Sequence, residues 1–102
     1  MDISKQLEQE FSLKPWQVKN TLQLIDDGNT IPFIARYRKE ATGSLDDQLL
    51  RELGDRLAYL RSLDEQKEKV ASSITEQELM TDEIMQSIDN AKTLTELEDI
   101  YR

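Results

Sequence analysis

Residues 28–45 read GNTIPFIARYRKEATGSL, and this is the one stretch of the chain that departs from ordinary amphipathic helix. Gly28 follows two aspartates and is typical of the left-handed residue that ends a helix. Thr30, with a proline two residues later, is a candidate N-cap for a new helix. Because a second turn is indicated at Gly43, the stretch predicts a short helix held between two turns.

The predicted short helix that follows Thr30 is strongly apolar. Its apolar residues are Ile31, Phe33, Ile34 and Tyr37. We expect this helix to insert into the helices that precede it. Tyr37 is expected in the core, because it has the spacing of Phe33 and Ile34.

Two short helices are predicted before this stretch. Asp2 is a candidate N-cap for the first, and Pro15 suits the first position of the second. The apolar faces of the two helices are formed by Ile3, Leu7 and Phe11, and by Trp16, Val18, Leu22 and Ile25. Since about three residues join them, we expect an antiparallel or crossed pair.

The longest helical pattern begins after Ser44, a candidate N-cap, and we predict one helix over residues 45–77. Its apolar stripe consists of Leu49, Leu53, Leu57, Leu60, Val70 and Ile74. Its solvent face carries opposite charges four residues apart, at Asp47–Arg51, Glu52–Arg56, Arg61–Glu65 and Glu65–Lys69. Gly54 costs this helix about 1 kcal/mol relative to alanine. A close helix crossing or no structural role at all would each explain the glycine.

The apolar stripe of the long helix is predicted to be an interface. Residues 1–44 supply only short helices, which cannot cover a helix about 50 Å long at about 1.5 Å per residue. Part of the stripe should therefore pack on domains outside this chain or on a second copy. We expect the isolated chain to self-associate through the stripe or to fray beyond about residue 64.

Two further short helices are predicted at the end of the chain. Thr81 is a candidate N-cap for one, and Thr93 with Glu96 forms a capping box for the other. No segment alternates with period two, so the predicted fold class is all-α. Short N-terminal helices pack on one long helix, which two short C-terminal helices follow. We expect a single helical region over residues 1–102, divided into 1–44, 45–77 and 78–102.

The composition excludes several classes of protein. The 102 residues include neither cysteine nor histidine, which removes disulfides and the commonest general base and metal ligand. No apolar run approaches the roughly 18 residues that span a membrane, so we expect a cytoplasmic protein. The net charge of −8 lies in residues 45–102, where fifteen Asp/Glu face seven Lys/Arg; residues 1–44 hold six of each. Nucleic acid would be repelled by the second part.

The chain offers no recognisable catalytic set. A Ser-His-Asp or Cys-His arrangement is impossible, and no glycine-rich phosphate loop occurs. Adjacent carboxylates at Asp46-Asp47, Asp82-Glu83 and Glu98-Asp99 point about 100° apart on a helix, so they do not converge on a metal ion or a proton. We therefore expect no enzyme activity, no metal site and no cofactor.

Arg36, Arg38 and Lys39 are the candidate nucleic-acid-binding residues. A guanidinium can hold a phosphate while the neighbouring Tyr37 stacks on a base. The same cations can instead pair with the acidic second half and brace the turn against the long helix. Both interpretations stay open.

Residues 29–43, NTIPFIARYRKEATG, resemble the signature of the Tex family of bacterial transcription accessory proteins. The resemblance covers nearly the whole chain, and further agreement occurs at residues 17–18, 26–28, 56–60 and 93–101. It implies the N-terminal helical region of a multidomain protein. In that family an RNase-H-like (YqgF-type) domain, a helix-hairpin-helix region and a C-terminal OB-fold RNA-binding domain follow.

The resemblance also implies a function. The chain would be a non-catalytic helical scaffold that packs on the downstream domains, while RNA or DNA is bound mainly through the OB-fold. The alternative is a protein-interaction module that binds another transcription component through residues 28–45.

Overall fold

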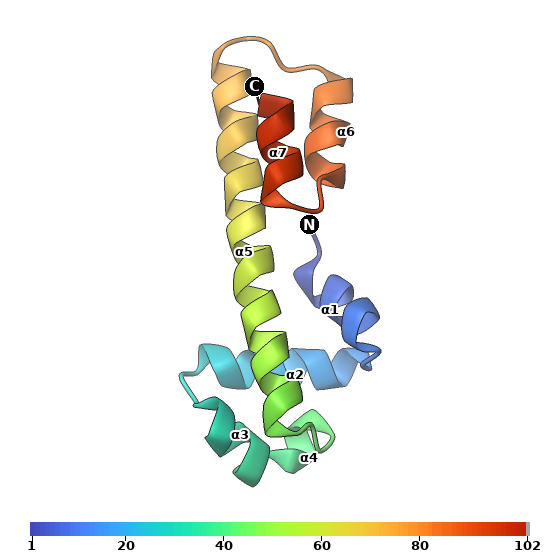
Figure 1. Ribbon diagram of the computed structural model, residues 1–102, viewed down its shortest axis with the longest axis vertical. Coiled ribbons are helices and arrows are strands. Elements are labelled where there is room, and N and C mark those ends of the chain that lie inside the picture. Colours follow the sequence, from blue (N-terminus) through green and yellow to red (C-terminus); the bar gives the residue numbers. More distant parts are fainter. Residues whose placement is uncertain (102) are drawn as a thin grey trace. The chain divides into compact units, whose positions relative to one another are not determined.

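The computed structural model describes residues 1–101, in which every regular element is a helix and no strand occurs (Figure 1). The helices are α1 Ile3–Phe11, α2 Pro15–Asp26, α3 Ile31–Tyr37, α4 Lys39–Thr42, α5 Asp47–Glu76, α6 Asp82–Asn90 and α7 Leu94–Tyr101. The predicted all-α class and the long central helix are confirmed. The helix predicted over residues 45–77 is found at 47–76.

The chain divides into two compact units. One holds Asp2–Tyr59, and the other holds the chain from Leu60 onward together with Met1. The first half of α5 belongs to the N-terminal unit and its second half to the C-terminal unit. The single helical region over residues 1–102 stays a prediction.

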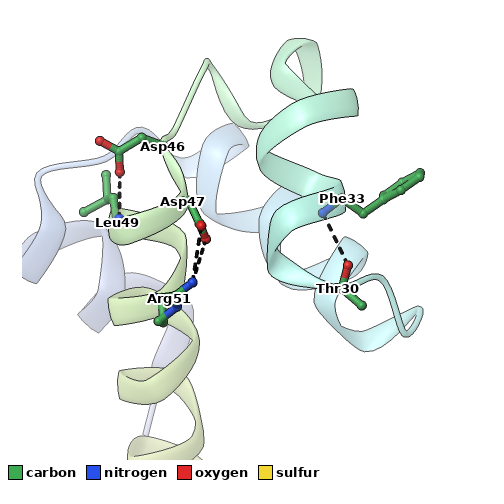
Figure 2. Close-up of polar contacts among 6 residues, drawn as sticks. All are labelled: Thr30, Phe33, Asp46, Asp47, Leu49 and Arg51. Atoms are coloured by element: carbon green, nitrogen blue, oxygen red, sulfur yellow. Dashed lines mark hydrogen bonds and ion pairs between the residues drawn. The ribbon is translucent and has the colours of Figure 1, made fainter.

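The helix starts of the N-terminal unit follow the predicted caps. The Asp2 carboxylate accepts a hydrogen bond from the Lys5 backbone N–H at 3.1 Å. The Thr30 hydroxyl accepts one from the Phe33 N–H at 3.3 Å (Figure 2). Gly28 has φ 92, the left-handed conformation predicted for the residue after a helix.

The predicted cap of the long helix is wrong. Asp46, not Ser44, caps α5, because its carboxylate accepts a 2.8 Å hydrogen bond from the Leu49 N–H (Figure 2). Ser44 has φ 65, whereas an N-cap residue needs an extended backbone. The helix therefore starts two residues later than the sequence pattern indicates.

The segment between α3 and α5 contains a one-turn helix, α4, where the sequence predicted only a turn. Side-chain amides of α2 satisfy the last carbonyls of α4. Gln17 Nε2 donates to the Thr42 carbonyl oxygen at 3.0 Å, and Asn20 Nδ2 donates to the Ala41 carbonyl oxygen at 3.0 Å. Gly43 follows with φ 74 and lies directly against Gln17. These contacts bind the turn to α2.

Four buried residues form a core cluster of the N-terminal unit: Leu24, Ile34, Leu45 and Leu50. Partly buried residues pack against it, namely Leu13, Ile25, Ile31, Ala35, Ala41 and Leu49. The cluster joins α2, α3 and the start of α5, so the short helix α3 inserts into the core as predicted.

The charged face of α5 pairs partly as predicted. Asp47–Arg51 and Glu65–Lys69 form ion pairs at 3.2 and 3.4 Å (Figure 2 shows the first). Arg56 was predicted to pair with Glu52, yet it binds Glu10 of α1, with Nε–Oε1 at 2.7 Å and Nη2–Oε2 at 3.0 Å. This two-pronged contact connects α1 to α5 across 46 residues of sequence.

The sequence predicted that the short helices leave part of the α5 stripe uncovered. Within this chain the buried members are Leu53, Leu57, Leu60 and Ile74. Leu49 and Val70 are half-buried. Self-association through the uncovered part of the stripe stays a prediction. Docking of the stripe on other domains stays a prediction, and only the half-buried residues Leu49 and Val70 are accessible for it.

Gly54 does not mark a close helix crossing. A Cβ atom built there would meet nothing nearer than Ile31 Cδ1 at 3.9 Å, an ordinary van der Waals distance. Of the two explanations of this glycine, the absence of a packing role is the one the contacts favour.

In the C-terminal unit, α5 runs upward in Figure 1, α6 runs back down and α7 runs up again. Thr81 caps α6 through the Ile84 N–H at 3.1 Å, and Thr93 caps α7 through the Glu96 N–H at 3.1 Å. Both caps were predicted. In a capping box the Glu96 carboxylate would accept a hydrogen bond from the N–H of Thr93, the N-cap residue. Here it accepts one from the Lys92 N–H.

Lys67 is the buried cation of this unit. It is 6% exposed, and its ammonium donates to the carbonyl oxygen of Asp89 near the end of α6 at 2.9 Å. Burial lowers the pKa of Lys67, while the carboxylates of Asp89, Asp64 and Glu96 oppose that shift. The contact places a positive charge at the negative end of a helix.

Candidate functional site

Two aromatic side chains of α3 are exposed on one helix face. Phe33 is 42% exposed and Tyr37 is 58% exposed, and their ring centroids lie 5.2 Å apart at 45°. Figure 2 shows the Phe33 ring directed away from its helix. The prediction that Tyr37 lies in the core is wrong, because the short helix buries only the side that carries Ile34.

A cation accompanies this aromatic pair. The Arg36 guanidinium carbon lies 5.3 Å from the centroid of the Tyr37 ring, which is a cation–π distance. Phe33, Arg36 and Tyr37 stand at positions i, i+3 and i+4, where helix side chains are neighbours. We call these three residues, together with Lys39, the α3 patch.

The three predicted cations differ in their partners. Arg38 Nε lies 2.8 Å from a carboxylate oxygen of Glu40, and the hydrogen bond from Arg38 lowers the pKa of that carboxyl. Within residues 1–101, Arg36 and Lys39 make no ion pair and are exposed. The pairing predicted with the acidic second half is therefore not found. Arg38 pairs with its own neighbour instead.

A groove of about 720 Å³ lies in the C-terminal unit between α5 and α7. Its apolar lining includes Val70, Leu94, Leu97 and Tyr101. The Tyr101 hydroxyl lies 2.6 Å from Ser73 Oγ, which fixes the last turn of α7 on α5. Of these residues, only Val70 belonged to the predicted interface. The apolar face of α7 could have indicated the rest.

Metal-binding clusters and membrane-spanning helices are both absent from the described residues. Between residues 1 and 101, no group of three or more aspartate or glutamate side chains could hold a metal ion. No helix in that range is both long enough and apolar enough to cross a membrane. The α3 patch and the α5–α7 groove are two surfaces that a partner could contact.

These observations describe an all-α domain with two open surfaces. The family model for the Tex-like protein N-terminal domain matches residues 1–75 of the sequence, and the chain belongs to that family. The family resemblance inferred from residues 29–43 is confirmed.

Curated relatives show the same family. The chain is 50% identical over 101 residues to the transcriptional accessory protein Tex of Neisseria gonorrhoeae, covering 99% of this chain and 13% of that protein. It is 50% identical over 99 residues to protein tex of Bordetella pertussis, covering 97% and 12%. It is 34% identical over 99 residues to the human S1 RNA-binding domain-containing protein 1, covering 97% and 10%. The chain therefore spans about an eighth of the length of its bacterial relatives.

Proposed function

We propose that this chain is a non-catalytic helical scaffold domain of a Tex-like transcription accessory protein, and that it packs on other domains of that protein. The observation that carries the proposal is the α5–α7 groove, which leaves half-buried Val70 and exposed Tyr101 beside a volume of about 720 Å³. Relatives that extend far beyond the matched region supply the chain that could fill such a groove.

Binding of RNA or DNA is proposed for the full-length protein and not for this chain alone. One relative is named for an S1 RNA-binding domain, and the net charge of −8 disfavours a polyanion here. Arg36, Arg38 and Lys39 would add a secondary contact at most, since Arg38 is already paired with Glu40. We expect a cytoplasmic location, because bacterial relatives are named for transcription.

The experiment compares Val70→Glu with Ser72→Glu in the full-length protein. Val70 lines the groove, whereas Ser72 is an exposed residue of the same helix outside it, so both variants add one charge to α5. If the groove holds another domain, Val70→Glu should speed trypsin cleavage between the domains severalfold, and Ser72→Glu should not. Equal cleavage of both variants would refute the scaffold proposal.

The isolated 102-residue chain supplies a second control. Val70 is only half-buried in this chain, so Val70→Glu should have a small effect on the isolated domain. A large loss of stability in the isolated chain would mean that Val70 serves the core of this unit and not a domain contact.

A further inference from the structure

We infer that the α3 patch is a docking surface for a protein partner that presents acidic side chains beside apolar ones. The inference goes beyond the scaffold proposal, because it concerns a different unit of the chain and a different partner.

The residue types of the patch are those that dominate protein–protein binding. Tyrosine and arginine are enriched among residues whose truncation costs most of the binding energy, and aromatic rings bury a large area with few rotatable bonds. Phe33 and Tyr37 expose 42% and 58% of their surface. Both rings are therefore available to a partner.

The patch is also held in place before any partner arrives. Ile34 is fully buried in the core cluster, and the Thr30 cap fixes the first turn of α3. Arg36 already lies over the Tyr37 ring, so less side-chain freedom is lost when it binds. A preorganised patch loses less conformational entropy on binding than a mobile one, so less of the binding free energy is offset.

Charge decides the chemistry of the partner. Arg36 and Lys39 make no ion pair within the described chain. Residues 28–45 hold three basic side chains and one acidic side chain, and the next acidic residues, Asp46 and Asp47, follow after the stretch ends. Glu40, the one acidic residue of the stretch, is occupied by Arg38. Arg36 lies beside the aromatic rings, and the unpaired Lys39 begins the next helix, α4. This combination complements a segment of aspartate or glutamate interleaved with leucine or phenylalanine.

Single-stranded nucleic acid fits this patch less well. A strand is bound by a basic groove that follows several phosphates, with bases stacked on open ring faces. Here only two cations are unpaired, and Arg36 already lies over the Tyr37 ring.

The test uses fluorescence anisotropy with the 102-residue chain and with the full-length protein. The probes are a labelled peptide of aspartate and leucine, the same peptide with asparagine in place of aspartate, and labelled oligouridine. Arg36→Ala and Phe33→Ala are the test variants. Arg38→Ala is the matched control, because it removes the same charge from a cation that is already paired.

The acidic peptide should bind, and each test variant should weaken that binding about tenfold or more. The control should weaken it less than about threefold, and the asparagine peptide should bind about tenfold more weakly than the acidic one. Circular dichroism should show unchanged helix content, since both test residues are exposed. Absent binding, equal effects of Arg36→Ala and Arg38→Ala, or tighter binding of oligouridine would each overturn the inference.

Discussion

Replacing Gly54 by alanine should stabilise the chain. Gly54 lies inside α5, where glycine costs about 1 kcal/mol relative to alanine, partly through the greater freedom of the unfolded chain. The added methyl group meets only Ile31 Cδ1 at 3.9 Å, so no clash offsets the gain. We expect the free energy of unfolding to rise by about 1 kcal/mol.

Urea denaturation followed by circular dichroism measures this change. With a slope of about 2 kcal/mol/M, the midpoint should rise by about 0.5 M. A midpoint that is unchanged or lower for Gly54→Ala would show that the glycine has a packing role, and the reasoning from its open surroundings would be refuted.

Gly43→Ala is the contrasting variant. Its φ of 74 makes alanine unfavourable by about 1 kcal/mol, and a Cβ there would clash with Gln17 Nε2. The Gln17 amide would have to leave the Thr42 carbonyl, which costs about another 1 kcal/mol. The midpoint should therefore fall by about 1 M, opposite in sign to Gly54→Ala.

Four further substitutions test individual contacts. Thr21→Val should stabilise the chain by about 1 kcal/mol in the same urea assay, because the fully buried Thr21 hydroxyl has no hydrogen-bond partner within residues 1–101. Asp46→Ala should lower the free energy of unfolding by about 1 kcal/mol, because it removes the N-cap of α5. Ser44→Gly should raise the free energy of unfolding, because glycine adopts the Ser44 φ of 65 without strain. The opposite signs would show that Ser44, and not Asp46, caps the helix. Glu10→Gln should cost about 0.5 kcal/mol at neutral pH, since the Glu10 and Arg56 side chains are 28% and 34% exposed. The hydrogen bond from Arg56 lowers the pKa of Glu10, so this contribution is present above its ordinary value of 4.5 and is lost as the pH falls through the lower native value; a difference independent of pH would contradict the contact.

Several features of the fold could be predicted because their causes lie within a few residues. Asp2, Thr30 and Thr81 each cap a helix through an N–H three residues ahead. Gly28 adopts the left-handed conformation that ends α2. Because such contacts join residues that are close in the sequence, the sequence predicts the order of the helices and the all-α class.

The candidate site was predicted only in part. The sequence singled out the stretch around Arg36 and Lys39, and its role in binding stays a prediction. The exposure of Tyr37 and the pairing of Arg38 with Glu40 were not predicted. Period and spacing place side chains on a helix face, yet they do not say which face a neighbouring helix covers. The groove beside Val70 was likewise visible only once α7 lay on α5.

By itself the sequence determined every helix except α4, most of the helix caps, the absence of cysteine and histidine, and the family. Only the tertiary structure decided that Leu53 and Ile74 are buried while Phe33 is exposed. It also decided that Gln17 holds Thr42 and that Glu10 holds Arg56. The physical reason is range: capping and helical periodicity act over about four residues, whereas burial depends on contacts between segments that are distant in the chain.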